Sequence, residues 1–70
     1  MNTVRYNAGN NSLIITIDGK TYPIPMQSSW RGTGQFALLG IAAAANELHG
    51  LWLPADVREQ IAQILKQQGF

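Results

Sequence analysis

The sequence has no cysteine and a single histidine among its 70 residues. Without thiols, the chain can form neither disulfide bonds nor thiolate zinc sites. One imidazole, His49, cannot by itself build a histidine-rich metal site. A chain this short buries only about 60% of its unfolded surface, and it is usually reinforced by disulfides, a metal or a partner chain. We therefore expect one domain, residues 1–70, that is reinforced by self-association.

Charged residues are also scarce. They make up 13% of the chain, against about 25% in an average domain. The net charge is +1, and the five Lys and Arg residues are scattered along the sequence. Because nucleic-acid-binding proteins usually show clustered basic residues, no strong electrostatic partner is expected. A surface with so few charges is available to another chain or to a ligand.

No long apolar segment is present. The run from residue 36 to residue 45 is about half of the roughly 20 residues that a membrane span needs. The N-terminal residues do not combine a charged region with an apolar core, so no secretory signal is evident. We therefore expect a soluble, cytoplasmic protein without a membrane partner.

The strongest local pattern is SLIITIDGKTYPIP, residues 12–25. Asp18-Gly19 is a preferred pair for a two-residue type I′ turn, and this turn fixes the register of a hairpin. Alternation then places five residues on the core face: Leu13, Ile15, Ile17, Tyr22 and Ile24. The two prolines of the second strand lack a ladder donor, which predicts an edge strand. A preceding strand in TVRYN completes a three-stranded antiparallel meander.

Two helices are expected after the sheet. Residues 35–49 are rich in Ala and Leu, and Gly50 is placed to end this helix. A second helix begins near Pro54, carries a single apolar stripe and has Gly69 as its terminating glycine. The sequence therefore predicts an α+β domain: a small antiparallel β-meander of three strands, followed by two α-helices packed on one face.

The stretch SSWRGTGQF, residues 28–36, is the best candidate for a binding site. The first turn of a helix exposes unpaired N–H groups, and the helix dipole adds positive potential, so a helix N-terminus can bind an anion. The candidate ligand-binding residues are Trp30, Arg31, Gly32, Thr33 and Gly34. Arg31 would pair with the charge, residues 32–34 would supply backbone donors, and Trp30 would stack on a base. The structural alternative is a glycine turn with Thr33 or Gly34 as helix cap and Trp30 packed on the sheet.

A second set of residues concerns contacts between chains. The first helix is apolar nearly all round, which is more than one small sheet can bury. Small residues four apart let helices approach closely. The predicted interface residues are Gly40, Ala43, Ala44 and Trp52. Trp52 lies in the connection between the helices, where it either forms an exposed hydrophobic patch for a partner protein or folds over the core.

No catalytic residue, metal ligand or cofactor is predicted. The serines and His49 lie on different elements, and nothing local brings two carboxylates together. A DNA reader of the helix-turn-helix type, with Arg58, Gln60 and Gln63 facing bases, is the weakest alternative, because acidic residues share that helix.

Two functions lead. The first is a non-enzymatic, homo-oligomeric protein that sequesters an anionic, nucleotide-like small molecule at residues 30–34. The alternative is a protein–protein inhibitor or adaptor that docks on a host protein through Trp52, Trp30 and the sheet edge. In size and composition the chain is similar to the small single-domain proteins that phages and mobile elements encode to block host machinery.

Overall fold

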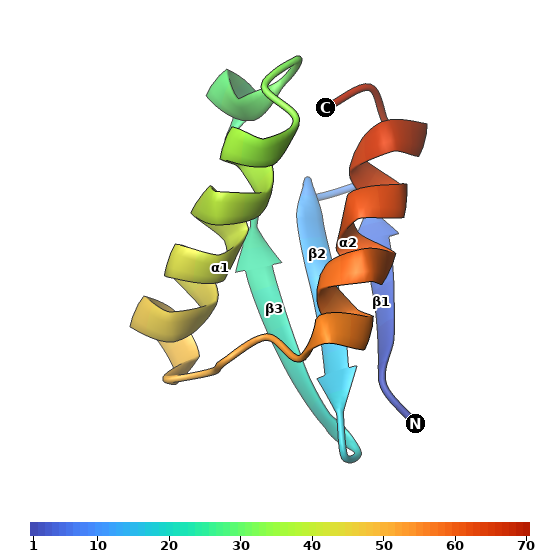
Figure 1. The fold of residues 1–70 in the computed structure, drawn as a ribbon, viewed down its shortest axis with the longest axis vertical. Coiled ribbons are helices and arrows are strands. Elements are labelled where there is room, and N and C mark those ends of the chain that lie inside the picture. Colours follow the sequence, from blue (N-terminus) through green and yellow to red (C-terminus); the bar gives the residue numbers. More distant parts are fainter.

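The computed structural model describes all 70 residues and has the element order β-β-β-α-α. The strands β1 (Thr3–Asn7), β2 (Ser12–Ile17) and β3 (Lys20–Pro25) form an antiparallel sheet in the order β1-β2-β3. A short 3-10 turn, η1 (Ser28–Trp30), leads to the helices α1 (Gln35–His49) and α2 (Ala55–Gln67). The two helices run antiparallel on the same face of the sheet, which confirms the predicted α+β architecture (Figure 1).

The hairpin has the register that its turn dictates. Ile15 pairs with Tyr22, which is the register that a two-residue turn at Asp18-Gly19 requires, and the remaining pairs follow in step. Asp18 and Gly19 have φ values of 51° and 79°, the positive values that a type I′ turn needs at both positions. The prolines of β3 lie on an edge strand, since β2 occupies the centre of the sheet.

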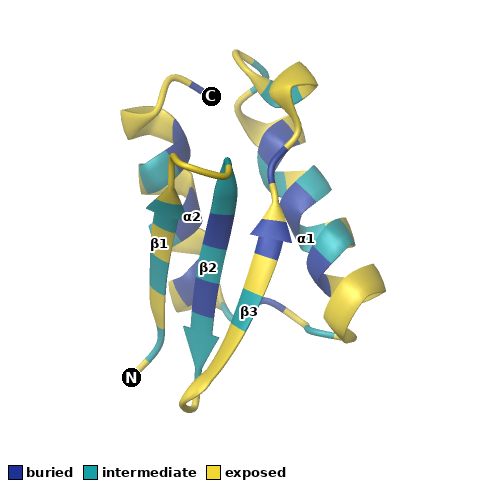
Figure 2. Cartoon of the chain, turned by 180° about the vertical axis from the view of Figure 1, so that it is seen from behind, coloured by how far each residue is buried: buried dark blue, intermediate teal, exposed yellow.

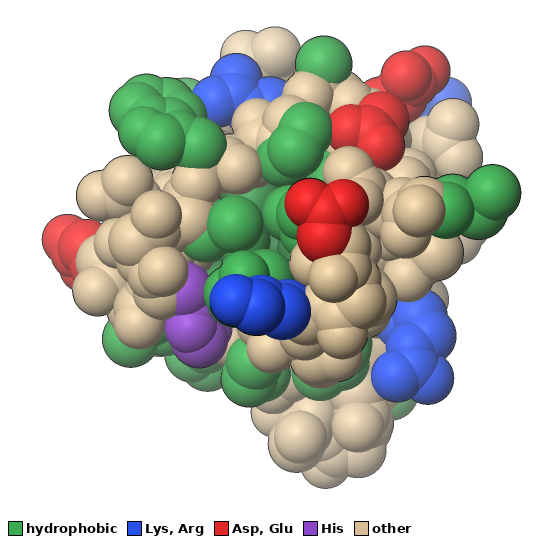
Figure 3. All heavy atoms as spheres, turned by 90° about the horizontal axis from the view of Figure 1, so that it is seen from below, with side chains coloured by type: hydrophobic (Ala, Val, Ile, Leu, Met, Phe, Trp, Pro, Cys, Tyr) green, Lys and Arg blue, Asp and Glu red, His purple; other side chains and the backbone are tan.

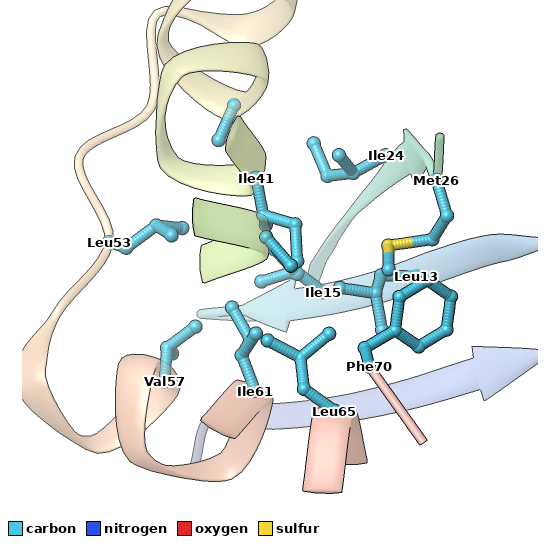
Figure 4. Packing of buried hydrophobic residues seen from close by; sticks show 12 residues of the cluster. Leu13, Ile15, Ile24, Met26, Ile41, Leu53, Val57, Ile61, Leu65 and Phe70 are labelled. Carbon is cyan, nitrogen blue, oxygen red and sulfur yellow. The ribbon is translucent and has the colours of Figure 1, made fainter. Parts of the chain in front are cut away.

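The core lies between the sheet and the helices, and side-chain alternation decides which strand residues enter it. Twelve residues are buried, and all of them are hydrophobic (Figure 2). On the predicted core face of the hairpin, Leu13, Ile15 and Ile24 are buried, and Ile17 and Tyr22 are half-buried at its margin. The helices contribute Ala37, Ile41, Ala45, Val57, Ile61 and Leu65 (Figure 4).

Phe70 is a core residue that the sequence pattern does not reveal. Gly69 has a φ of 80° and ends α2 as predicted, and the Phe70 N–H then donates to the Leu65 carbonyl at 2.8 Å. This arrangement is a Schellman motif, which turns the chain back over the helix. It directs the Phe70 ring into the core, where only 7% of the residue stays exposed (Figure 4).

The side chain of Gln60 fastens α2 to the edge strand β1. Its Nε2 donates to the Asn2 carbonyl at 3.0 Å, and its Oε1 accepts from the Val4 N–H at 3.2 Å. The amide thus offers β1 one donor and one acceptor, as a further strand would. Exposed sheet edges invite pairing with other chains, so this contact protects the edge. It also removes Gln60 from the set of residues that could read DNA.

Neither helix is long and apolar enough to cross a membrane.

Candidate functional site

Residues 30–34 form the corner between η1 and α1, and Trp30 lies against α1. A Cβ built on Gly40 would come within 2.5 Å of Cζ2 of the Trp30 indole. The ring therefore occupies the space that a side chain at Gly40 would need. Trp30 is half-buried and packs against the core. The side of the indole that faces Gly40 is consequently closed to a ligand.

Arg31 joins this corner to the end of α2. Its Cζ lies 4.8 Å from the centroid of the Phe70 ring, a cation–π distance. Its Nη1 donates to the Gln68 carbonyl at 3.5 Å. A cation beside the last carbonyls of a helix is also favoured by the helix dipole. Arg31 thus has partners within the chain, although its side chain remains exposed.

The glycines of the corner turn the chain into α1. Gly32 and Gly34 have φ values of 76° and 57°, and Gly34 occupies the N-cap position. Thr33, the other cap that the sequence allows, does not cap the helix, because its hydroxyl donates to the Trp30 carbonyl. The Gly34 N–H donates to the main-chain oxygen of Phe70 at 2.7 Å. The Thr33 N–H donates to the Trp30 carbonyl at 3.0 Å, so two of the three backbone donors predicted to hold an anion are paired within the chain.

Two donors at the start of α1 remain. None of the backbone hydrogen bonds there uses the N–H groups of Gln35 or Ala37. Ala37 is completely buried, so only the N–H of Gln35 belongs to an exposed residue. Such groups are the normal remainder of a first helical turn, and they carry the partial positive charge of the helix N-terminus.

A hollow of about 480 Å³ lies beside this helix start, between the first turns of α1 and the last turns of α2. Its volume falls in the range of small-molecule sites, about 300–1,000 Å³. Its apolar lining consists of Leu38, Ala62, Leu65 and Phe70. The rest of its lining consists of Gly34, Gln35, Lys66 and Gly69. Of the five predicted ligand-binding residues, only Gly34 lines the hollow. Lys66 is a further lining residue, and the antiparallel helices bring this cation of the last turn of α2 to the first turn of α1.

The predicted interface residues divide into two groups. Gly40 is covered by the chain's own Trp30, and Ala44 is half-buried and packs against the core. Ala43 is exposed, and Trp52 has 76% of its surface exposed. Only Ala43 and Trp52 therefore offer surface to another molecule.

A single chain does not bury α1 on most sides. The helix buries small and medium side chains against the core, while Phe36 and Leu39 are 73% and 64% exposed. Near its C-terminal end, Leu48 is 57% exposed. Figure 3 shows the end of the molecule that carries the hairpin turn, where hydrophobic side chains reach the surface between a few charged ones. The apolar character of α1 thus extends onto the surface of the protein.

His49 belongs to the contact between α1 and β3. Its Nε2 lies 2.9 Å from the Pro23 carbonyl, and its ring meets the Tyr22 ring edge-on at 5.3 Å. With Gln60 on β1, both edges of the sheet are partly covered. No group of three or more His, Asp or Glu side chains is placed to hold a metal ion.

The geometry thus brings the unpaired N–H group of Gln35, the Lys66 ammonium and an apolar hollow together at one end of the helix pair. The chain matches no protein-family model, no curated protein and no solved structure.

Proposed function

We propose that the protein binds an anionic, nucleotide-like small molecule, without chemical turnover, in the hollow between the start of α1 and the end of α2. The observation that carries the proposal is that one hollow combines an apolar lining with a helix N-terminus and a lysine. Ligand sites typically join a largely apolar lining to a few placed polar groups. This hollow, rather than the outer surface of residues 30–34, is the proposed site.

The anionic group of the ligand is placed at the start of α1. The N–H group of Gln35, which lines the hollow, has no backbone partner, and the helix dipole favours negative charge at this position. Lys66 supplies a full positive charge from α2. Arg31 contributes indirectly in this proposal, because its contacts with Phe70 and Gln68 hold the corner against α2.

The uncharged part of the ligand is placed on the apolar lining. Leu38 and Ala62 offer aliphatic surface to a sugar or base. Trp30 is not the proposed stacking partner, since its ring packs on Gly40. Phe70 is not the stacking partner either, because only 7% of its surface is exposed.

Isothermal titration calorimetry with adenosine monophosphate, adenosine and inorganic phosphate tests this function. Adenosine monophosphate should bind saturably and more tightly than either fragment, because only the nucleotide uses both parts of the hollow. Lys66→Gln should weaken its binding about tenfold, which corresponds to about 1.4 kcal/mol.

Lys20→Gln is the matched control, since it makes the same charge change on the exposed hairpin, away from the hollow. It should leave the affinity unchanged. Equal losses in both variants would show general electrostatic attraction instead of a site, and an absence of saturable binding would contradict the proposal.

Docking on a host protein is the second candidate function, and Trp52 is the observation that favours it. This side chain is 76% exposed. The other two predicted contacts are weaker, because Trp30 packs on its own helix and both sheet edges are partly covered. If docking is the function, Trp52→Ser abolishes the complex with the host protein and leaves the calorimetric titrations unchanged.

A further inference from the structure

The surface that α1 shares with the α1–α2 connection holds both a projection and a recess. The projection is Trp52, which is 76% exposed. The same side chain forms one wall of a hollow of about 370 Å³, whose other apolar walls are Ala42 and Ala43 of α1 and Leu51 and Leu53 of the connection. The two alanines leave open space where larger side chains would fill it.

We propose that this surface binds a second copy of the chain across a two-fold axis, so that Trp52 of each copy enters the hollow of the other. In such a contact both copies use the same patch, and the patch must therefore complement itself. A surface that presents a projection beside a recess meets this condition. A single projection or a single recess would suffice for an unrelated partner.

The charges around the hollow are also self-complementary. Glu47 and Arg58 are the charged residues of its lining. Neither takes part in a side-chain hydrogen bond within the chain. One acid and one base cancel, so two copies do not repel each other. In the proposed pair, Glu47 of one copy faces Arg58 of the other.

The surrounding surface can supply the area that a stable pair needs. A standard interface covers about 800 Å² on each partner, and a buried aromatic side chain provides about 150–250 Å² of it. Trp52 would form the centre, and Leu39, 64% exposed, extends the apolar surface along α1. The chain itself buries only 12 of its 70 residues, so a partner copy would add substantially to its core. This inference does not rest on the proposed ligand, because the two hollows have no lining residue in common.

Analytical ultracentrifugation over a range of protein concentrations tests the pairing. The wild-type protein should sediment as a dimer, and Trp52→Ser should sediment as a folded monomer, with circular dichroism as the check on folding. Leu48→Gln is the matched control, because it removes an apolar side chain that is 57% exposed but does not line the hollow. Leu48 follows Ala43 by five residues, so helical geometry turns it to another side of α1. This control should remain dimeric. A monomeric wild type, or a dimer that Leu48→Gln breaks and Trp52→Ser does not, overturns the proposal.

A charge exchange tests the pairing geometry. Glu47→Arg and Arg58→Glu should each weaken dimerisation about tenfold or more, since each places like charges across the axis. An equimolar mixture of the two variants should dimerise again, because every cross-axis pair in the mixed dimer is opposite in charge. Effects within one chain cannot produce this recovery. A mixture that stays as weak as the separate variants overturns the two-fold arrangement.

Discussion

Gly40 lies in the apolar sequence of α1 at the point where the Trp30 ring crosses the helix. A glycine normally weakens a helix interior by about 1 kcal/mol relative to alanine. Here the missing side chain lets the indole approach the helix backbone, and the ring in turn holds the corner of residues 31–34 in place. The sequence shows only that the residue is small. The partner that fills the space comes from a segment ten residues earlier, and its path is set by tertiary structure.

Gly40→Ala is therefore expected to destabilise the protein by about 1–3 kcal/mol, the usual cost of overpacking. The added Cβ would have to displace Trp30, whose nearest ring atom lies at 2.5 Å. In a Trp30→Ala background the same substitution should instead stabilise the fold by up to about 1 kcal/mol, through helix propensity alone. Urea denaturation of the four proteins measures both effects. A stabilising Gly40→Ala in the wild-type background would refute the contact.

Arg31→Gln is expected to lower stability by about 0.5–1 kcal/mol, the contribution of an exposed cation–π contact. The guanidinium lies 4.8 Å from the Phe70 ring centroid. Because Arg31 does not line the ligand hollow, Arg31→Gln should lower the affinity for adenosine monophosphate less than Lys66→Gln does. Thermal denaturation and calorimetry give the two values. A larger loss of affinity in Arg31→Gln than in Lys66→Gln would place the anion at the corner instead of in the hollow.

At the scale of elements, α2 does more than cover the sheet. Through Gln60 it supplies hydrogen bonds to the open edge of β1, and through Phe70 it closes the core at its C-terminal end. Its apolar stripe could be predicted because helical periodicity is local. The role of Gln60 could not, because a polar residue on a helix looks solvated until a strand 56 positions away is placed beside it.

Gln60→Ala is expected to destabilise the protein by about 1–3 kcal/mol, since two hydrogen bonds of about 0.5–1.5 kcal/mol each are lost. The Val4 amide should also exchange its hydrogen faster, because its acceptor is Gln60 Oε1. Gln63→Ala, an exposed position on the same helix, should change stability by less than about 0.5 kcal/mol. Chemical denaturation of both variants and hydrogen exchange at Val4 test these expectations. Equal, small effects in the two variants would mean that the edge contact contributes nothing.

The parts of the fold that the sequence predicts are those determined within a few residues. The Asp18-Gly19 turn sets the hairpin register, and Gly50 and Gly69 mark the ends of the helices. The hollow itself is not predicted from the sequence, and of the candidate residues 30–34 only Gly34 lines it. The start of α1 meets the end of α2 only after folding, when the Gly34 N–H binds the Phe70 oxygen. Local sequence patterns do not predict this contact between the two helix ends.

At the scale of the whole molecule, the antiparallel helix pair has two hollows with different surroundings. One lies at the start of α1 and offers Lys66 and a helix N-terminus. The other lies toward the end of α1 and offers Trp52 with one acid and one base. We assign the first to a ligand and the second to a partner copy. The two activities should then be separable by mutation.

Trp52→Ser should bind adenosine monophosphate with wild-type affinity, and Lys66→Gln should dimerise as the wild type does. Each substituted residue lines one hollow and not the other. Calorimetry and ultracentrifugation of both variants complete the comparison. Loss of nucleotide binding in Trp52→Ser would show instead that the ligand site is formed only in the dimer.

Amide chemical shifts in a nucleotide titration are the most direct test of the ligand site at the start of α1. With ¹⁵N-labelled protein and adenosine monophosphate, we expect a saturable shift of the Gln35 amide, whose N–H group lines the hollow and lacks a backbone partner. Amides around Arg58, beside the other hollow, should not move. Shifts that centre on Arg58, or that fail to saturate at Gln35, would show that the nucleotide does not bind at the start of α1.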